Sequence, residues 1–216
     1  MIDGIRLKVC GLTSIVDAEL ADRCGADYLG FILYPKSPRY LPLTSYEAMG
    51  PRLPDRKKVA VSVEPSLTEL TAMQTAGFDF FQIHFGLGYS HSLIAAWSRT
   101  VGPEKLWLAP KLPPEQDVPA DLLPLAHYFL LDTFHPEKFG GTGQTGDWAK
   151  FSRHQKNHAD AFWILSGGLN PENIGEAVRQ TGARFVDVNS GVESAPGVKD
   201  LEKLKRFVVG LHKSQV

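Results

Sequence analysis

Short apolar runs that predict buried β-strands recur eight times along the chain, and most are followed by a stretch of helical pattern. Successive runs lie roughly 25 residues apart, which is typical of units made of one strand and one helix. A doubly wound open sheet would need only five or six such units. The count therefore predicts an α/β fold of the closed (β/α)8 type, the TIM barrel. The predicted strands are residues 7–10, 27–33, 58–63, 78–84, 105–109, 127–132, 162–165 and 184–189.

Capping residues and prolines place the helices between these strands. Thr13 is expected to cap a helix over residues 15–24, and Asp147 is expected to cap one that starts at the next residue. The fifth helix has the weakest signal, because several prolines leave only residues 120–125 for it.

The composition suits one folded domain that spans residues 1–216. Hydrophobic residues make up 43% of the chain and charged residues 22%, a balance that supports a core large enough to fold unaided. The formal net charge of -1 gives no general attraction for nucleic acid or for an anionic membrane, so any anion binding must be local. The sequence does not decide between a monomer and a homodimer.

The N-terminus and the cysteine content predict a cytoplasmic protein. No apolar stretch approaches the roughly 18 to 20 residues of a transmembrane helix, and the first residues lack the charged and apolar regions of a signal peptide. The two cysteines, Cys10 and Cys24, are too few for a disulfide framework and lack the spacing of a zinc site. They are expected to be reduced thiols.

Two strand ends near the C-terminus carry the pattern of a phosphate site. After the apolar run of residues 162–165, Gly167-Gly168 allows a tight turn, and Asn170-Pro171 supplies a cap and a first-turn proline for a helix. Residues without side chains beside a helix N-terminus leave backbone N–H groups that can hold an anion. Ser190-Gly191 follows the eighth strand in a similar way, and barrels of this type frequently bind phosphate with the loops after strands seven and eight. Taken alone, the first loop could also be an ordinary connection.

Reactive side chains stand at the ends of other predicted strands, where the active site of a (β/α)8 barrel lies. A thiol and a carboxylic acid that face each other across a barrel mouth can serve as general base and general acid. The candidate residues are Cys10, Arg39, His84, Asp132 and Asp187, which end or follow strands one, two, four, six and eight.

Each candidate also has a purely structural interpretation. A free cysteine is more often a small buried hydrophobe than a catalyst, but Cys10 lies at a strand end beside Lys8, and a nearby cation would favour its thiolate. Asp132 could simply cap a turn, yet burial there would favour its protonated form, as a proton donor requires. His84 could be a core histidine with satisfied hydrogen bonds, and Lys8 could point outward into the helix layer.

Short motifs run in order along nearly the whole chain. They include Lys8-Val-Cys-Gly-Leu-Thr13, Gly25-Ala-Asp27, Tyr34-Pro-Lys-Ser-Pro-Arg-Tyr40, Leu131-Asp132, Gly140-Gly-Thr-Gly143, Leu165-Ser-Gly-Gly-Leu-Asn-Pro-Glu-Asn173, and the stretch from Asp187 to Glu193 with Pro196-Gly197 and Lys199-Asp200. Any one of them would be a weak signal, but together they are specific. The set resembles the phosphoribosylanthranilate isomerase family of tryptophan biosynthesis.

The resemblance implies an Amadori rearrangement that needs no cofactor and no metal. N-(5'-phosphoribosyl)anthranilate would become 1-(2-carboxyphenylamino)-1-deoxyribulose 5-phosphate. By analogy with the family, Asp132 would protonate the furanose ring oxygen so that the ring opens to a Schiff base, and Cys10 would then remove the proton at C2. A thiol with its ordinary pKa of about 8.5 is mostly protonated at neutral pH, so the site is expected to favour the thiolate.

The resemblance also implies how this phosphosugar-anthranilate substrate is bound. Arg39, whose guanidinium is a rigid bidentate donor, would bind the anthranilate carboxylate. The two glycine-containing loops would hold the phosphate, Asp187 would contact a sugar hydroxyl, and the loop of residues 140–143 would close over the substrate. The expected binding residues are Lys8, Arg39, His84, Gly140, Gly141, Gly167, Gly168, Asp187, Ser190 and Gly191.

The chain departs from the family's pattern at several strand ends. The usual Val-Gln-Leu-His-Gly block appears as Phe81-Gln-Ile-His-Phe-Gly86, so that Phe85 is inserted and could displace His84. The third strand ends in Ser62-Val-Glu64 where Phe-Val-Asn is usual, and the fifth strand is bulkier than in the family. Asn189 stands where serine is common. These differences fall on the half of the mouth where the anthranilate ring is expected.

Two alternatives compete with this interpretation. Indoleglycerol phosphate synthase is another phosphate-binding barrel of the same pathway, but it works with lysine and glutamate and has a long N-terminal extension, whereas this chain offers cysteine and aspartate. A non-enzymatic relative could keep the phosphate cradle and bind a phosphosugar only as a regulator or an assembly partner. The presence of both Cys10 and Asp132 argues against that alternative, whereas the insertion of Phe85 keeps it open.

Overall fold

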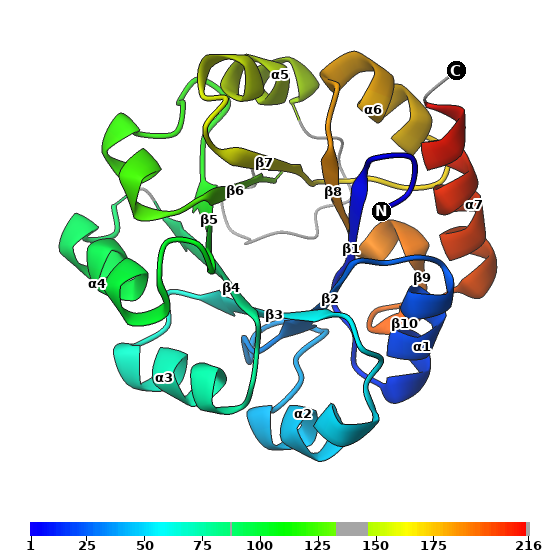
Figure 1. Ribbon diagram of the computed structural model, residues 1–216, viewed down its shortest axis with the longest axis horizontal. Coiled ribbons are helices and arrows are strands. Elements are labelled where there is room, and N and C mark those ends of the chain that lie inside the picture. Colours follow the sequence, from blue (N-terminus) through cyan, green and yellow to red (C-terminus); the bar gives the residue numbers. More distant parts are fainter. Residues whose placement is uncertain (87, 133–146, 215–216) are drawn as a thin grey trace.

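Eight parallel strands close into a barrel in the computed structural model, which describes residues 1–86, 88–132 and 147–214 (Figure 1). The strands pair in sequence order, and β1 closes the barrel by pairing with β8, which sets Lys8 opposite Asp187. The (β/α)8 prediction is therefore confirmed. The strands are β1 (Arg6–Val9), β2 (Tyr28–Ile32), β3 (Lys57–Val63), β4 (Phe80–Gly86), β5 (Leu106–Lys111), β6 (Tyr128–Leu131), β7 (Phe162–Leu165) and β8 (Phe185–Val188).

Helices surround the barrel as an outer ring (Figure 1). The segment predicted to be the fifth helix, Ala120–Leu125, forms a short 3-10 helix instead of an α-helix, in keeping with Pro124 inside it. The α-helices of the described residues are α1 (Ile15–Arg23), α2 (Leu43–Met49), α3 (Leu67–Thr75), α4 (His91–Val101), α5 (Trp148–Asn157), α6 (Ile174–Thr181) and α7 (Leu201–Lys213).

The capping predictions hold for α5 but not for α1. At the start of α5, the Asp147 side chain accepts a hydrogen bond from a first-turn N–H, as predicted. The cap of α1 is Ser14, whose side chain accepts from a first-turn N–H in the same way. The prediction of Thr13 was wrong by one residue, because the Thr13 hydroxyl donates to the carbonyl of Gly197 at 2.6 Å.

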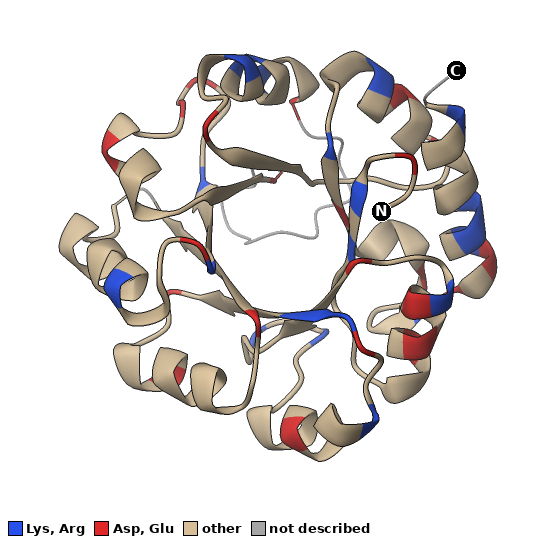
Figure 2. Cartoon of the chain, viewed as in Figure 1, with Lys and Arg blue, Asp and Glu red and all other residues tan. Residues whose placement is uncertain are grey.

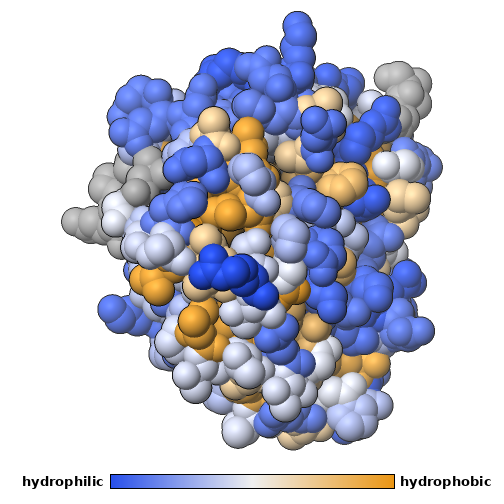
Figure 3. Space-filling view, turned by 60° about the vertical axis from the view of Figure 1, so that its left-hand side comes forward, coloured by the Kyte–Doolittle hydropathy of each residue, from blue (hydrophilic) through white to orange (hydrophobic). Residues whose placement is uncertain are grey.

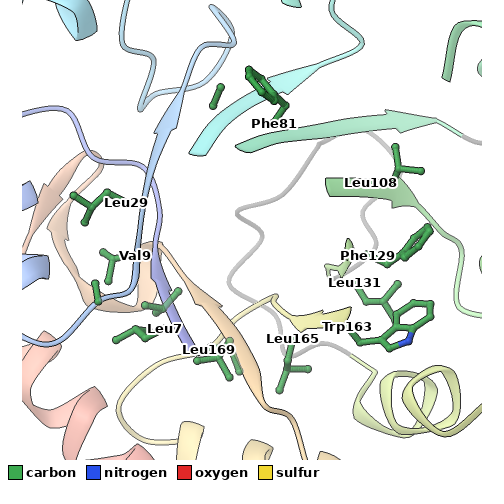
Figure 4. Close-up of a cluster of buried hydrophobic side chains, with 14 of the residues drawn as sticks. Leu7, Val9, Leu29, Phe81, Leu108, Phe129, Leu131, Trp163, Leu165 and Leu169 are labelled. Atoms are coloured by element: carbon green, nitrogen blue, oxygen red, sulfur yellow. The ribbon is translucent and has the colours of Figure 1, made fainter. Parts of the chain in front are cut away.

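Alternation of side chains along the strands separates two apolar layers. Outward-facing residues such as Leu7, Leu29 and Phe129 pack between the barrel and its helices (Figure 4). Inward-facing aromatic residues near the strand starts fill the N-terminal end of the barrel, where the rings of Tyr28 and Phe185 stack with 4.9 Å between their centroids. The barrel is therefore a packed core at that end and not a channel.

The outer surface mixes charged and apolar residues. Basic and acidic residues are interspersed around the helices (Figure 2), in keeping with a net charge of -1. On the face shown in Figure 3, apolar residues occur in small groups between polar ones. None of the helices in the described ranges is long and apolar enough to cross a membrane.

Candidate active site

A cavity of about 410 Å³ opens at the carboxyl ends of the strands. Its walls come from strands β2, β3, β4 and β6, from the ends of β1, β7 and β8, and from the loop after β2. The predicted residues that border it are Cys10, Arg39, His84, Asp132, Gly167, Gly168, Asp187 and Ser190. Lys8 and Gly191 contact lining residues without bordering the cavity, whereas Gly140 and Gly141 lie outside the described residues.

Cys10 and Asp132 both border this cavity, which is the geometric condition for acid–base work on one substrate. Each follows directly on the last residue of its strand, β1 or β6, and the alternation of side chains turns each inward. Cys10 is only 3% exposed and is a free thiol. The structure therefore brings the two residues to one chamber, and their catalytic roles stay a prediction.

Lys8 points into the barrel and not into the helix layer. Its ammonium lies 2.9 Å from Oδ1 of Asp187, and its side chain has no exposed surface. Gly30 on β2 leaves the necessary room, because a Cβ there would lie 2.9 Å from Cε of Lys8 and 3.0 Å from Sγ of Cys10. Burial opposes the charge on Lys8, but Asp187 and Cys10 outweigh it and raise the pKa of the ammonium above its ordinary value. The buried ammonium of Lys8 therefore lies next to the thiol.

The ionisation of Cys10 differs from the expectation. Burial raises the pKa of the thiol, although the charges of Lys8 and Lys199 act in the opposite direction. The expectation that the surroundings alone favour a thiolate is therefore wrong for the protein without substrate.

The loops after β7 and β8 meet at one side of the cavity, as predicted for a phosphate site. Gly167 and Gly168 have φ angles of 88° and 62°, a conformation that favours glycine. A Cβ at Gly191 would lie 2.0 Å from the carbonyl oxygen of Leu169, so the two loops can approach only because this residue is glycine. Among the described residues, the backbone N–H groups of Gly167, Gly168, Ser190 and Gly191 have no hydrogen-bond acceptor. Such a group of free donors is suited to an anion.

Asparagines behind the Gly167-Gly168 turn hold its conformation. The side-chain amides of Asn173 and Asn170 donate to the carbonyl of Gly168 at 2.9 and 3.3 Å. Oδ1 of Asn170 accepts from the N–H groups of Glu172 and Asn173, so residues 171–173 form a turn. Helix α6 therefore begins at Ile174, and the prediction that Pro171 lies in its first turn was wrong.

Arg39 borders the cavity but already has a partner in the protein. Its Nε and Nη2 atoms donate to the carboxylate of Glu193 at 2.9 and 2.7 Å, and both side chains are buried. The Nε–Nη2 edge of the guanidinium is therefore occupied by Glu193. Nη1 has no acceptor among the described residues, so a ligand carboxylate would meet Arg39 at its Nη1–Nη2 edge.

Sequence reasoning did not single out Glu193 as a functional residue. It starts β9 (Glu193–Ala195), which pairs antiparallel with β10 (Val198–Lys199). The turn between them is Pro196-Gly197, and the φ angle of Gly197 is 82°, the pattern of a type II turn. Pro196-Gly197 predicts a turn from the sequence alone, but it does not predict that the hairpin places Glu193 against Arg39.

The inserted Phe85 leaves His84 at the cavity. Strand β4 runs two residues beyond its predicted end to Gly86, and the insertion is absorbed as part of this strand. Phe85 points outward and packs against Trp97 of α4, with 5.9 Å between ring centroids. The suggestion that Phe85 displaces His84 is therefore wrong.

His84 is a neutral member of the cavity wall. Burial, together with the charge of Lys8, lowers the pKa of the imidazole to about 4. Its Nε2 atom lies 2.8 Å from Nε2 of Gln82, two residues earlier on the same face of β4. Gln82 is 1% exposed, and its Oε1 atom has no partner among the described residues. Sequence reasoning missed Gln82, although the two-residue period from His84 could have indicated it.

The fold and the site together define a class of protein. The mouth of a (β/α)8 barrel carries free backbone donors for an anion, a buried thiol and a carboxyl group around one cavity of small-molecule size. These features define a (β/α)8 barrel whose mouth is suited to binding an anion and to transferring protons.

Comparisons with known proteins identify the family within this class. The family model for N-(5'-phosphoribosyl)anthranilate (PRA) isomerase matches residues 7–209. The N-(5'-phosphoribosyl)anthranilate isomerase of Cereibacter sphaeroides is 37% identical over 95% of this chain and 97% of its own. The chain belongs to the N-(5'-phosphoribosyl)anthranilate isomerase family.

Solved structures agree with this assignment. The phosphoribosyl anthranilate isomerase of Thermotoga maritima superposes with a TM-score of 0.79 at 30% identity, over 98% of this chain and 100% of that one. A phosphoribosyl anthranilate isomerase in complex with reduced 1-(o-carboxyphenylamino)-1-deoxyribulose 5-phosphate superposes with a TM-score of 0.75 at 28% identity, with the same coverage. The resemblance inferred from the sequence motifs is therefore confirmed.

Proposed function

We propose that this chain converts N-(5'-phosphoribosyl)anthranilate into 1-(2-carboxyphenylamino)-1-deoxyribulose 5-phosphate, with Asp132 as general acid and Cys10 as general base. The family match over residues 7–209 supports the reaction. The observation that carries the assignment of roles is that both side chains border one cavity beside the free backbone donors of the β7 and β8 loops. The proposed reaction is an internal rearrangement, in which ring opening and proton transfers shift the double bonds of the substrate, and it needs no metal or cofactor.

The first step is opening of the furanose ring. Asp132 donates its proton to the ring oxygen, the C1–O bond breaks, and the nitrogen lone pair forms a C=N bond at C1. The product is a protonated Schiff base with a free C4 hydroxyl. A carboxyl group held at the edge of a barrel mouth is suited to this donation, because the cavity walls keep water away from the breaking bond.

The second step is removal of the C2 proton by Cys10. The positive charge of the protonated Schiff base, added to the buried charge of Lys8, favours the thiolate that burial alone disfavours. The C2–H electron pair forms a C1–C2 double bond, and the C=N pair returns to nitrogen to give the enolamine. Reprotonation at C1 and loss of the C2 hydroxyl proton give the ketone.

Binding residues divide the substrate between two ends of the cavity. The phosphate would accept hydrogen bonds from the N–H groups of the β7 and β8 loops. The anthranilate carboxylate would meet the Nη1–Nη2 edge of Arg39, whose Nε–Nη2 edge is held by Glu193. Asp187, paired with Lys8 through Oδ1, would accept from a sugar hydroxyl through its second oxygen. The loop with Gly140 and Gly141 is proposed to cover the substrate.

Two features of the protein's setting are part of the proposal. The proposed base is the thiolate of Cys10, which must stay reduced, and both Cys10 and Cys24 are free, so we place the protein in the cytoplasm. The described wall of the cavity consists of residues of this chain, and a monomer fits the proposal. A solved relative from Thermotoga maritima is described as dimeric, so a homodimer with two independent sites fits the proposal equally.

Turnover of phosphoribosylanthranilate, made in situ and followed by its fluorescence, tests the proposal. We expect Cys10→Ala and Asp132→Asn each to lose at least about two orders of magnitude in kcat, because each removes a group that transfers a proton in the reaction. Cys24→Ala, which removes the other free thiol, is the matched control and should keep wild-type turnover. Equal turnover by all four proteins would contradict the roles assigned here.

A further inference from the structure

Glu193 lies between two buried cations at the edge of the cavity. Its Oε2 atom accepts from Nη2 of Arg39 at 2.7 Å, and its Oε1 atom accepts from Nζ of Lys199 at 2.8 Å. The side chain of Glu193 is 4% exposed, that of Arg39 10%, and that of Lys199 not at all. One carboxylate therefore binds both cations in a place that water scarcely reaches.

The hairpin of β9 and β10 holds this carboxylate rigidly. Glu193 and Lys199 are partners across the hairpin. The hairpin is fastened to the start of α1, because Thr13 donates to the carbonyl of Gly197 at 2.6 Å and Asp17 accepts from the backbone N–H of Lys199 at 2.9 Å. A Cβ at Gly197 would lie 3.1 Å from Thr13, so the two segments are closely packed. The position of Glu193 is therefore set by backbone structure and not by a flexible loop.

Lys199 links the same carboxylate to the phosphate loop. Its ammonium donates to Oδ1 of Asn189 at 3.0 Å and to the backbone carbonyl of Asn189 at 3.3 Å. Asn189 directly precedes Ser190 and Gly191, which carry two of the free N–H donors. A continuous chain of charge-assisted hydrogen bonds thus runs from Arg39 through Glu193 and Lys199 to the loop after β8.

We propose that Glu193 is a positioning residue that fixes the separation between Arg39 and the phosphate-binding loop after β8. The fixed separation selects ligands whose carboxylate and phosphate lie at the matching distance. Lys199 is the second positioning residue of the same chain of contacts. This inference rests on the proposed function, because it takes the ligand to carry an aromatic carboxylate at one end and a phosphate at the other. Neither side chain takes part in the proton transfers.

Steady-state kinetics of Glu193→Gln provide the test. The amide keeps the shape of the side chain but cannot hold two cations, so Arg39 loses its fixed orientation. We expect KM to rise by about tenfold or more while kcat changes by less than about threefold, which is the signature of lost ground-state and transition-state binding together. Glu193→Asp, which keeps the charge but is one methylene shorter, should lie between the wild type and Glu193→Gln. Glu202→Gln on the exposed face of α7 is the matched control and should behave as wild type.

A ligand that lacks the carboxylate separates this role from a merely structural one. We expect Glu193→Gln to weaken binding of the reduced product, 1-(2-carboxyphenylamino)-1-deoxyribitol 5-phosphate, by about tenfold in calorimetry. It should leave the affinity for the phenylamino analogue without the carboxyl group unchanged. In an Arg39→Met background the same substitution should add less than about twofold, because the two residues act as one unit.

Each outcome decides one point. A wild-type protein without turnover would overturn the proposed function, whereas an active wild type with an unchanged KM in Glu193→Gln would overturn only the positioning role. A fall in kcat at constant KM would also overturn it, and so would an equal loss of affinity for both ligands. Should Glu193→Gln not fold, Glu193→Asp carries the same comparison of the two ligands with a smaller expected change.

Discussion

The two sides of the barrel mouth are built in different ways. Around the ends of β7 and β8 the cavity wall includes backbone N–H groups without acceptors among the described residues, and the two loops can approach this closely only because Gly191 has no side chain. Around β4 the polar groups are the side chains of Gln82 and His84. Loop conformation defines the first side, whereas residue identity defines the second. The first side depends on the close contact at Gly191, whereas the second accommodates the inserted Phe85 within strand β4.

Gly191→Ala should disrupt the loops after β7 and β8 and cause the largest loss of activity of these variants. Its methyl group would lie 2.0 Å from the carbonyl oxygen of Leu169, so the two loops must separate and several donors lose their alignment. We expect kcat/KM to fall by at least about a thousandfold, since loss of one aligned donor alone costs about a hundredfold to a thousandfold. Steady-state kinetics with phosphoribosylanthranilate would measure this.

Gly50→Ala is the control for that prediction, because a Cβ at Gly50 meets nothing within 4 Å. A Gly191→Ala protein with near-wild-type kcat/KM would show that close contact of the two loops is not what shapes the phosphate side.

Phe85→Ala tests whether the inserted residue near β4 contributes to stability or to substrate binding. Phe85 is 1% exposed and packs against Trp97, so we expect it to stabilise the fold and to leave substrate binding alone. The free energy of unfolding should fall by about 3 to 5 kcal/mol in urea titrations, as for other buried phenylalanines. KM should stay within about twofold of wild type. Leu93→Ala, on α4 but 42% exposed, should lose far less stability, and a large rise in KM for Phe85→Ala would assign the insertion to the substrate side instead.

His84→Asn should reveal a pH dependence of stability. The pKa of His84 is lowered from 6.5 to about 4 in the folded protein, so the unfolded chain binds a proton there that the folded one refuses. The wild type should therefore lose stability as the pH falls from 6.5 to about 4, and this gap corresponds to at most about 3 kcal/mol. Above pH 7 the contribution vanishes.

Unfolding curves at pH 7 and pH 4.5 would measure that difference. His84→Asn should lose less stability between the two values than the wild type does. His91→Asn, at an exposed position of α4, is the control. A wild type and a His84→Asn protein with the same pH dependence would mean that His84 is not a neutral member of the wall.

Features that depend on a few consecutive residues were predictable from the sequence. The eight apolar runs and the Gly167-Gly168 turn follow from local chemistry, and the barrel rule then places Cys10 and Asp132 at the mouth. The start of α6 was missed because Asn170 caps a turn before the helix and not the helix itself.

Features that depend on distant segments were not predictable in this way. Lys8 and Asp187 are 179 positions apart, and Arg39 and Glu193 are 154 apart, so no local pattern pairs them. The raised pKa of Cys10 was missed for the same reason, because it comes from burial in the closed barrel.

Closure of the barrel by its first and last strands also bears on how the protein is made. Lys8 emerges early during synthesis, but the carboxylate that neutralises it is Asp187, so the lysine has no counter-ion until the last strand has left the ribosome. A cation enclosed without its partner is strongly unfavourable, so an unfinished chain is unable to complete its interior around Lys8. Activity should therefore begin only after translation has ended, and a product truncated before the eighth strand should carry the thiol but no working site.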